Sequence, residues 1–200
     1  MDLGLKGKNA VISGSSQGIG HAIAKSLVEE GCNVALSARN QERLDQAVAE
    51  FVAKGVTATG IVCDFSNEAG CGAFIEEAAK SLGGIDILVN NVGGMIPGTI
   101  DSVTPEIWDT ILNTNLMSFV HTTKYAVPYI RKSKAGRILN VSGVTGKQLL
   151  PGALTTTIPN TAIHGFAKIM AAELGPDNIT VNTICPGFTN TESGGPRAEG

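Results

Sequence analysis

The sequence contains no long hydrophobic run and no leader-like beginning. Its apolar stretches all fall short of the roughly 20 residues that a membrane-spanning helix requires. The first residues, Met1–Lys6, lack the apolar segment and the small-residue cleavage site of a secretory signal peptide. We therefore expect neither a membrane protein nor a secreted one, but a cytoplasmic protein.

The sequence also lacks closely spaced cysteine pairs and a large net charge. The four cysteines, Cys32, Cys63, Cys71 and Cys185, form no C-x-x-C pair and no spacing with histidine that is typical of a zinc site. We expect reduced, mostly buried thiols and no bound metal. The formal net charge of −3 provides no basic surface, so nucleic acid and anionic membranes are not expected partners.

The composition and patterning of the 200 residues suit one α/β domain, because 42% hydrophobic residues suffice for a buried core. Short runs rich in Val, Ile and Leu alternate with amphipathic segments, which indicates βαβ units and a doubly wound parallel sheet. The expected strands are 9–13, 33–37, 57–62, 85–90, 136–141 and 179–184. The expected helices are 19–30, 41–54, 68–82, 105–132 and 160–174. We predict a single domain over residues 1–192 and a flexible tail at 193–200.

A glycine-rich turn joins the first expected strand to the first expected helix. In such a turn Gly14 permits the tight bend, Gly18 lets the backbone approach a pyrophosphate, and Gly20 lets the helix pack closely on the sheet. The positive end of the helix then faces the phosphates. The sequence therefore predicts a Rossmann-type dinucleotide site. Its phosphate-binding turn contains Gly14, Ser15, Ser16, Gly18, Ile19 and Gly20.

The end of the second expected strand bears on which dinucleotide is bound. An acidic residue there accepts hydrogen bonds from the ribose hydroxyls of NAD and repels a 2′-phosphate. This chain has no acid at that place, and Arg39 follows Ala38. The planar guanidinium of an arginine suits a phosphate. We predict NADP(H) rather than NAD(H), with Arg39 as an ordinary solvated side chain as the alternative.

Motifs along the whole chain resemble those of the short-chain dehydrogenase/reductase family. The spacing Gly14-x-x-x-Gly18-Ile19-Gly20 is similar to the glycine motif of that family. The other matching positions are Asn90-Asn91-Val92-Gly93 after strand four, Asn115 on the long helix, and Pro186-Gly187 after strand six. The resemblance covers about residues 5–192 and is closest to 3-oxoacyl-carrier-protein reductases.

The resemblance implies further cofactor contacts, a substrate and an assembly. Asp64 and Phe65 match a pair that contacts the adenine, and Thr191 matches the residue that holds the nicotinamide amide. The remaining implied cofactor-binding residues are Asn91, Gly93, Pro186 and Gly187. The implied substrate is a small carbonyl or alcohol, and the implied assembly is a homo-oligomer, a dimer or a tetramer. The family also continues through a helical lobe and a seventh, C-terminal strand; the 200 residues given stop before that segment, so we expect the sheet formed by them to lack that strand.

The catalytic positions depart from the family's pattern. There, a Tyr exchanges the proton of the substrate oxygen, a Lys four residues later lowers the pKa of that Tyr, and a Ser orients the carbonyl. Counting back from Pro186 places these positions at Thr156, Asn160 and Gly143, with Ser142 one residue early. A threonine hydroxyl is too weak an acid for this work near neutral pH. We predict carbonyl–alcohol hydride transfer with an impaired centre; the alternative is a non-catalytic cofactor-binding or assembly module.

Other residues near these positions are candidates for a replacement role. Ser142 is a candidate carbonyl donor, and His164 and Lys147 are candidate acids. Asn115 is expected either to bond backbone at a helix irregularity or to join the family's proton relay.

Pro159 bears on the shape of the same region. Proline is best tolerated in the first turn of a helix, so the helix at 160–174 is expected to begin close to Pro159. The segment 156–160 is then a loop or a first turn, with Thr156 or Thr157 as a cap.

Overall fold

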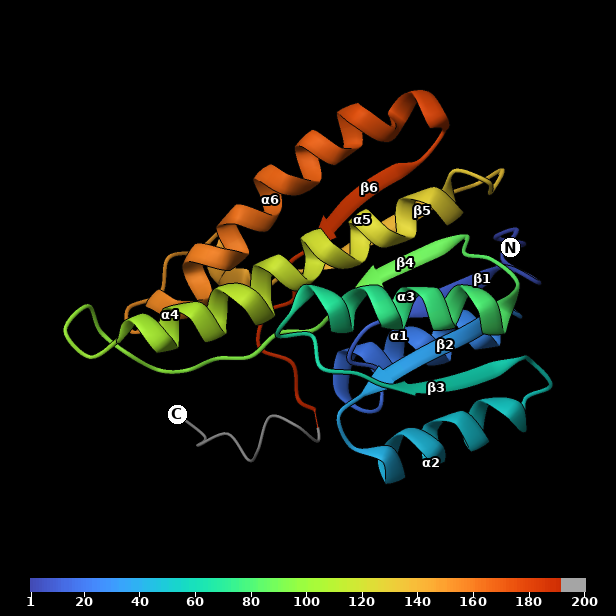
Figure 1. Cartoon of the computed structure of the whole chain (residues 1–200), viewed down its shortest axis with the longest axis horizontal. Coiled ribbons are helices and arrows are strands. Elements are labelled where there is room, and N and C mark those ends of the chain that lie inside the picture. The colour runs from blue at the N-terminus through green and yellow to red at the C-terminus, as the bar shows by residue number, and fades with distance from the viewer. Residues whose placement is uncertain (192–200) are drawn as a thin grey trace.

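The sheet is the centre of the fold. The computed structural model describes residues 1–191, and the predicted tail at 193–200 lies outside that range (Figure 1). Six parallel strands lie in the order β3-β2-β1-β4-β5-β6, and their arrows point the same way in Figure 1. The strands are β1 Asn9–Ile12, β2 Asn33–Ala38, β3 Ala58–Val62, β4 Ile87–Asn90, β5 Arg137–Val141 and β6 Thr180–Ile184. The predicted doubly wound parallel sheet is confirmed.

Helices cover both faces of this sheet. They are α1 Gly18–Glu29, α2 Gln41–Val52, α3 Glu68–Leu82, α4 Pro105–Leu112, α5 Ser118–Ile130 and α6 Leu154–Leu174. Helices α1 and α2 pack on one face, and α3, α5 and α6 pack on the other (Figure 1). Strand β1 has β2 on one side and β4 on the other, so the chain reverses its winding direction there. The carboxyl ends of β1 and β4 therefore border the crevice in which such sheets bind ligands.

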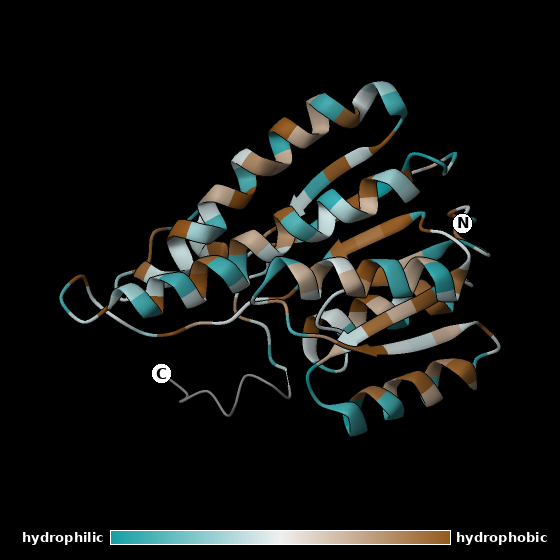
Figure 2. Ribbon diagram, viewed as in Figure 1, coloured by the Kyte–Doolittle hydropathy of each residue, from teal (hydrophilic) through white to brown (hydrophobic). Residues whose placement is uncertain are grey.

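The strands supply the core from both of their faces. Val11 and Leu88 lie in the hydrophobic cluster under α3 and α5, whereas Ala10 and Ile12 lie in the cluster under α1 and α2. All four side chains are fully buried. Figure 2 accordingly shows predominantly apolar central strands and helices with one polar side. Because both faces of these strands are buried, their sequences are nearly continuous apolar runs.

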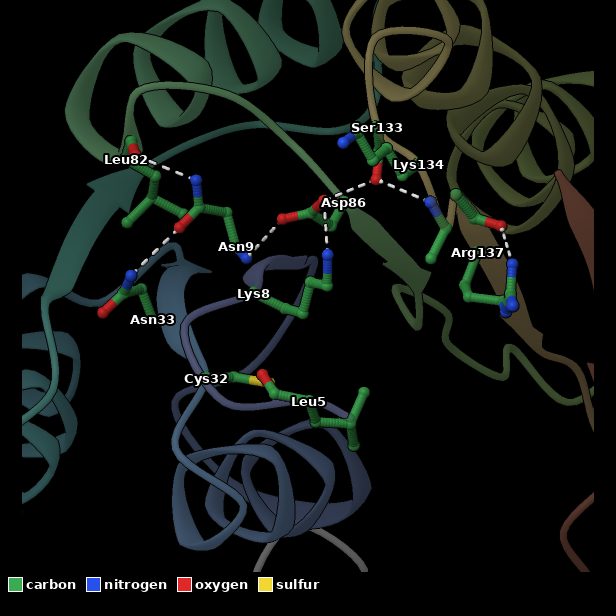
Figure 3. Close-up of polar contacts among 12 residues, drawn as sticks. Leu5, Lys8, Asn9, Cys32, Asn33, Leu82, Asp86, Ser133, Lys134 and Arg137 are labelled. Carbon is green, nitrogen blue, oxygen red and sulfur yellow. Dashed lines mark hydrogen bonds and ion pairs between the residues drawn. The ribbon is translucent and has the colours of Figure 1, made fainter. Parts of the chain in front are cut away.

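A polar network fixes the amino ends of β1, β4 and β5 (Figure 3). The carboxylate of Asp86 accepts hydrogen bonds from the backbone N–H of Asn9, at 2.9 Å, and from the hydroxyl of Ser133. Lys8 Nζ lies 3.6 Å from the same carboxylate. The Asn9 side chain continues the network by donating to the carbonyl of Leu82 at 2.9 Å. These bonds hold together the amino ends of the strands, at the opposite end of the sheet from the crevice at the carboxyl ends.

The structure corrects two of the predicted helices. The segment 105–132 is not one helix, because a π-helical turn at Asn113–Met117 separates α4 from α5. The helix predicted at 160–174 begins at Leu154, six residues earlier, and Pro159 lies inside it. Pro159 has no N–H to donate to the carbonyl of Thr155, and its ring crowds that carbonyl. The helix nevertheless continues through it, and Pro159 is buried.

The cysteines are free thiols, as predicted. Cys32, Cys63 and Cys71 are buried and Cys185 is half-buried. Burial raises the pKa of the Cys63 thiol to about 12, which keeps it neutral and unreactive. Over residues 1–191 no group of three or more potential metal ligands comes together, and no helix is both long enough and apolar enough to cross a bilayer.

Candidate cofactor groove and catalytic cavity

The glycine turn after β1 has the backbone that the sequence predicts. Gly14 and Gly18 have φ angles of +62° and +64°, a left-handed region that side chains with a Cβ rarely adopt. A Cβ added to Gly20 would lie 2.3 Å from the carbonyl oxygen of Gly14 and 2.5 Å from Nδ2 of Asn91. The start of α1 therefore packs directly on the turn, and the geometry fits a phosphate-binding cradle.

The two serines of this turn have different positions. Ser16 lines the groove above the turn, together with Gly14, Gly18 and Ile19. Ser15 is fully buried; its hydroxyl donates to the carbonyl of Ile12 at 2.8 Å and accepts from the backbone N–H of Ser37 at 3.1 Å. The hydroxyl of Ser15 therefore links β1 to β2, and Ser15 is not among the described residues that line the groove. A contact of Ser15 with the cofactor stays a prediction.

A groove of about 840 Å³ runs along the carboxyl ends of the strands. At one end it is lined by Arg39, Asp64 and Phe65, as the sequence predicts for the adenosine half of a dinucleotide. Hydrogen bonds from the backbone and hydroxyl of Ser66, aided by the nearby Arg39, hold the pKa of the Asp64 carboxyl below its ordinary value. Asp64 is thus an anion whose oxygens are already oriented within the 64–66 turn.

The sequence interpretation missed Arg43, which lines the same end of the groove from the first turn of α2. Its guanidinium donates to the side-chain oxygen of Gln17 in the glycine turn. The signal was present, because a residue four positions after Arg39 reaches back over the first turn once Asn40 caps the helix.

Two asparagines line the middle of the groove, and the side-chain amides of both are hydrogen-bonded to backbone. Asn91 Nδ2 donates to the carbonyls of Gly14, at 2.9 Å, and Ser13, at 3.2 Å, so it ties the end of β4 to the glycine turn. Asn115 is 5% exposed and lies in the π-helical turn. Its Oδ1 accepts from the N–H of Gly94 at 2.9 Å and its Nδ2 donates to the carbonyl of Gly94 at 2.7 Å.

The four predicted catalytic residues come together in one place. A cavity of about 250 Å³ adjoins the groove, sharing Ile19, Asn91 and Gly93 with it. Its walls include Asn115, Ser142, Thr156 and Asn160. Every described side chain that lines this cavity is neutral and outside the range of acid–base chemistry near pH 7.

Helix α6 places Thr156 and Asn160 one turn apart on the face that lines this cavity. Of the two forms expected for 156–160, the loop is wrong: the segment lies in the first two turns of a helix whose N-cap is Ala153 rather than Thr156 or Thr157. Both hydroxyl protons near the cavity are engaged internally: Thr156 donates to the carbonyl of Ala153 at 3.1 Å, and Ser142 donates to the carbonyl of Asn160 at 3.2 Å. The amide of Asn160 donates to the hydroxyl of Thr145 at 2.8 Å.

Gly143 and Asn160 fit each other. A Cβ added to Gly143 would lie 2.8 Å from Asn160 Nδ2. The backbone of Gly143 is extended, with φ −144° and ψ 161°, so any residue can adopt it. The missing side chain at 143 is therefore what leaves room for the amide of Asn160 to reach Thr145.

The other candidate replacements lie away from the cavity. His164 follows Asn160 on α6, but its Nε2 lies 3.5 Å from Cys185 Sγ, and the ring is not among the cavity's described lining. Lys147 is exposed at the end of a 3₁₀ turn and does not line it either. The structure therefore gives neither side chain a place at the predicted reaction centre.

The turn after β6 is only partly in the groove. Thr191 lines the groove and also an adjoining hollow beside α1, whereas Pro186 lines only that hollow. The carbonyl of Pro186 accepts a hydrogen bond from Val144 N–H at 3.0 Å. Gly187 lines neither the groove nor the catalytic cavity. Pro186 thus holds the loop that carries Gly143, and a direct contact of Pro186 or Gly187 with a cofactor stays a prediction.

The family model for short chain dehydrogenases matches residues 8–200. The chain belongs to the short-chain dehydrogenase family. It is 37% identical over 188 residues to human dehydrogenase/reductase SDR family member 4, covering 94% of this chain and 68% of that protein. It is 38% identical over 192 residues to the uncharacterized oxidoreductase YvrD of Bacillus subtilis, covering 96% of this chain and 72% of that one.

Solved structures share the same architecture. L-sorbose reductase from Gluconobacter frateurii, complexed with NADPH and L-sorbose, superposes with a TM-score of 0.93 at 36% identity, covering 96% of this chain and 74% of that one. A short-chain dehydrogenase from Burkholderia cenocepacia in complex with NADP superposes with a TM-score of 0.90 at 32% identity, covering 94% and 77% of the two chains. The predicted family and fold are confirmed.

Proposed function

We propose that this family member is an oxidoreductase that binds NADP(H) and catalyses slow hydride transfer between the cofactor and a small carbonyl or alcohol. The cofactor assignment is supported by Arg39 in the groove, by the glycine cradle and by the NADP and NADPH complexes of the similar structures. Bound NADPH would supply the hydride. The chain would hold its phosphates with the turn at 14–20 and its adenosine half beside Arg39 and Asp64.

The slow rate is inferred from one observation. Among residues 1–191, the side chains that line the catalytic cavity are all neutral, and the hydroxyls of Ser142 and Thr156 already donate to backbone carbonyls. A substrate oxygen there meets amide N–H groups, but no group able to give or take its proton near pH 7. Loss of a positioned general acid costs about 10²–10⁴ in rate. Proximity of bound reactants still accelerates the step, so activity is reduced rather than absent.

The alternative is a non-catalytic cofactor-binding or assembly module on the same fold. It is favoured by the internal bonds of Ser142, Thr156 and Asn160, which hold the cavity in one arrangement without any substrate. A fold of this type does not fix the chemistry by itself.

Measurements of cofactor binding and of catalytic turnover distinguish the slow oxidoreductase from the non-catalytic module. We expect wild-type protein to bind NADPH more tightly than NADH in a fluorescence titration, because Arg39 lines this end of the groove and strand β2 ends in Ala38 rather than in an acidic residue. We expect turnover of aldehydes, ketones and 3-oxoacyl thioesters of about 10⁻³ s⁻¹ or slower, against about 10 s⁻¹ for a typical enzyme. Binding with no turnover above the uncatalysed rate selects the module, and turnover near 10 s⁻¹ contradicts the impaired centre.

We also propose that the chain forms a homo-oligomer through the helical face that contains α5 and α6. Helix α6 leaves Ile158 and Ile169 exposed, at 45% and 64%, on a helix that otherwise packs on the core. Apolar side chains of this size on one helix suit a protein interface. Light scattering at micromolar concentration should give at least twice the mass of one chain, and Ile169→Glu should lower it. A monomer at that concentration would contradict the assembly.

A further inference from the structure

The structure places two arginines, not one, at the adenosine end of the groove. Arg39 follows β2, and Arg43 lies in the first turn of α2 after the capping residue Asn40. Both side chains are exposed and both line the groove. The chain therefore brings two guanidinium groups to one end of a site in which a single carboxylate, Asp64, is found among the described lining residues.

The positive charge at this end is not neutralised by ion pairs. Among the ion pairs of residues 1–191, neither Arg39 nor Arg43 has a carboxylate partner. Asp64 lies near Arg39, but its two oxygens accept hydrogen bonds from Ser66. A site with two unpaired guanidinium groups and one carboxylate favours a dianionic ligand such as a phosphate monoester.

A contact with the glycine turn orients the second arginine. One terminal nitrogen of Arg43 donates to the side-chain oxygen of Gln17. An amide partner fixes the position of the guanidinium but leaves its charge in place, and the remaining N–H groups of the fork stay available. The guanidinium, carried by α2, is thus bonded to the turn at 14–20 at the lining of the groove.

We infer that Arg43 is a second specificity-determining residue, which binds the 2′-phosphate of the cofactor together with Arg39. This inference rests on the proposed binding of NADP(H). Two planar forks approaching from β2 and from α2 can each donate to different oxygens of one phosphate. NADH has hydroxyls at that place, so Arg43 contributes to the preference between the two cofactors rather than to dinucleotide binding in general.

Calorimetric titration of the full chain tests this role with four probes: NADPH, NADH, adenosine 2′,5′-bisphosphate and 5′-AMP. Arg43→Ala should weaken NADPH and the bisphosphate about tenfold and leave NADH and 5′-AMP within about twofold, because one charge-assisted contact is lost. Arg39→Ala/Arg43→Ala should weaken NADPH about 100-fold. Arg43→Lys should fall between wild type and Arg43→Ala, since it keeps the charge and loses the fork.

The controls separate this inference from the proposed function. Arg131→Ala removes an exposed arginine that pairs with Asp177 elsewhere on the molecule, and it should leave all four affinities unchanged. If wild type prefers NADPH and Arg43→Ala changes that preference less than twofold, Arg39 acts alone and the inference fails. Equal weakening of NADPH and NADH would show a purely structural role through Gln17. If wild type binds no dinucleotide, the proposed function itself fails.

Discussion

Replacing Gly143, Thr156 and Asn160 together by Ser, Tyr and Lys is expected to raise NADPH-dependent carbonyl reduction by about 10²–10⁴-fold. The triple change restores a proton donor, a cation beside it and a carbonyl donor. Thr156 and Asn160 already lie one turn apart on α6 and line the same cavity, so the new side chains enter it from the helix face that the chemistry requires. Steady-state rates under saturating NADPH measure the gain.

The single changes should do little, because such residues act as a unit. Gly143→Ser alone should even disturb the cavity, since its Cβ meets the amide of Asn160 at 2.8 Å. Thr156→Phe in place of Thr156→Tyr, in the same triple background, is the matched control: it fills the same space without the hydroxyl. A gain that the Phe variant shares would contradict acid catalysis. No gain despite tight NADPH binding would show that the cavity does not position a substrate.

Gly20→Ala is expected to lower the affinity for NADPH by about 100-fold and the free energy of unfolding by about 1–3 kcal/mol. The new methyl group would lie 2.3 Å from the carbonyl oxygen of Gly14 and 2.5 Å from Asn91 Nδ2. Because backbone forms one of these contacts, α1 or the turn must move, and the phosphate-binding amides move with it. Titration with NADPH and urea denaturation report the two effects.

Gly165→Ala is the matched control for that change. Gly165 is an exposed glycine inside α6, and a Cβ there meets no atom within 4 Å. Alanine at such a place should raise the free energy of unfolding by up to about 1 kcal/mol and leave NADPH binding unchanged. Unaltered NADPH binding by Gly20→Ala would mean that the cofactor phosphates do not sit on this turn.

The regular elements were predictable because their signals are local. The six strands were placed to within two residues, since strands buried on both faces are continuous apolar runs between glycine-marked helix ends. The π-helical turn around Asn115 was foreseen only as one alternative, a helix irregularity. Within that turn, Asn115 makes two hydrogen bonds to Gly94, a residue 21 positions away that no local pattern connects to it.

The incorrect or missed predictions also depend on contacts between residues that are far apart in the sequence. Pro159 is a helix-starting signal by itself, yet packing of α6 on the core carries the helix through it to Leu154. Ser15 lies in the predicted phosphate-binding turn, yet its hydroxyl accepts from the N–H of Ser37 in the neighbouring strand β2 and donates to the carbonyl of Ile12. The place of Arg43 in the first turn after Asn40 is a local signal, but its contact with Gln17 joins two segments that are 26 residues apart, and only the structure shows it. In each case a partner from elsewhere in the chain decided the outcome.

The sequence by itself determined the βαβ order, the glycine turn after β1 and the arginine after β2. It also has Gly143, Thr156 and Asn160 where the resemblance implies Ser, Tyr and Lys. These are facts of residue identity and short-range spacing. Only the tertiary structure decided that Thr156 and Asn160 share a helix face, that Asn160 occupies the space left by Gly143, and that a second guanidinium reaches the groove. Such distances depend on how helices pack on the sheet, and packing is set by the whole chain at once.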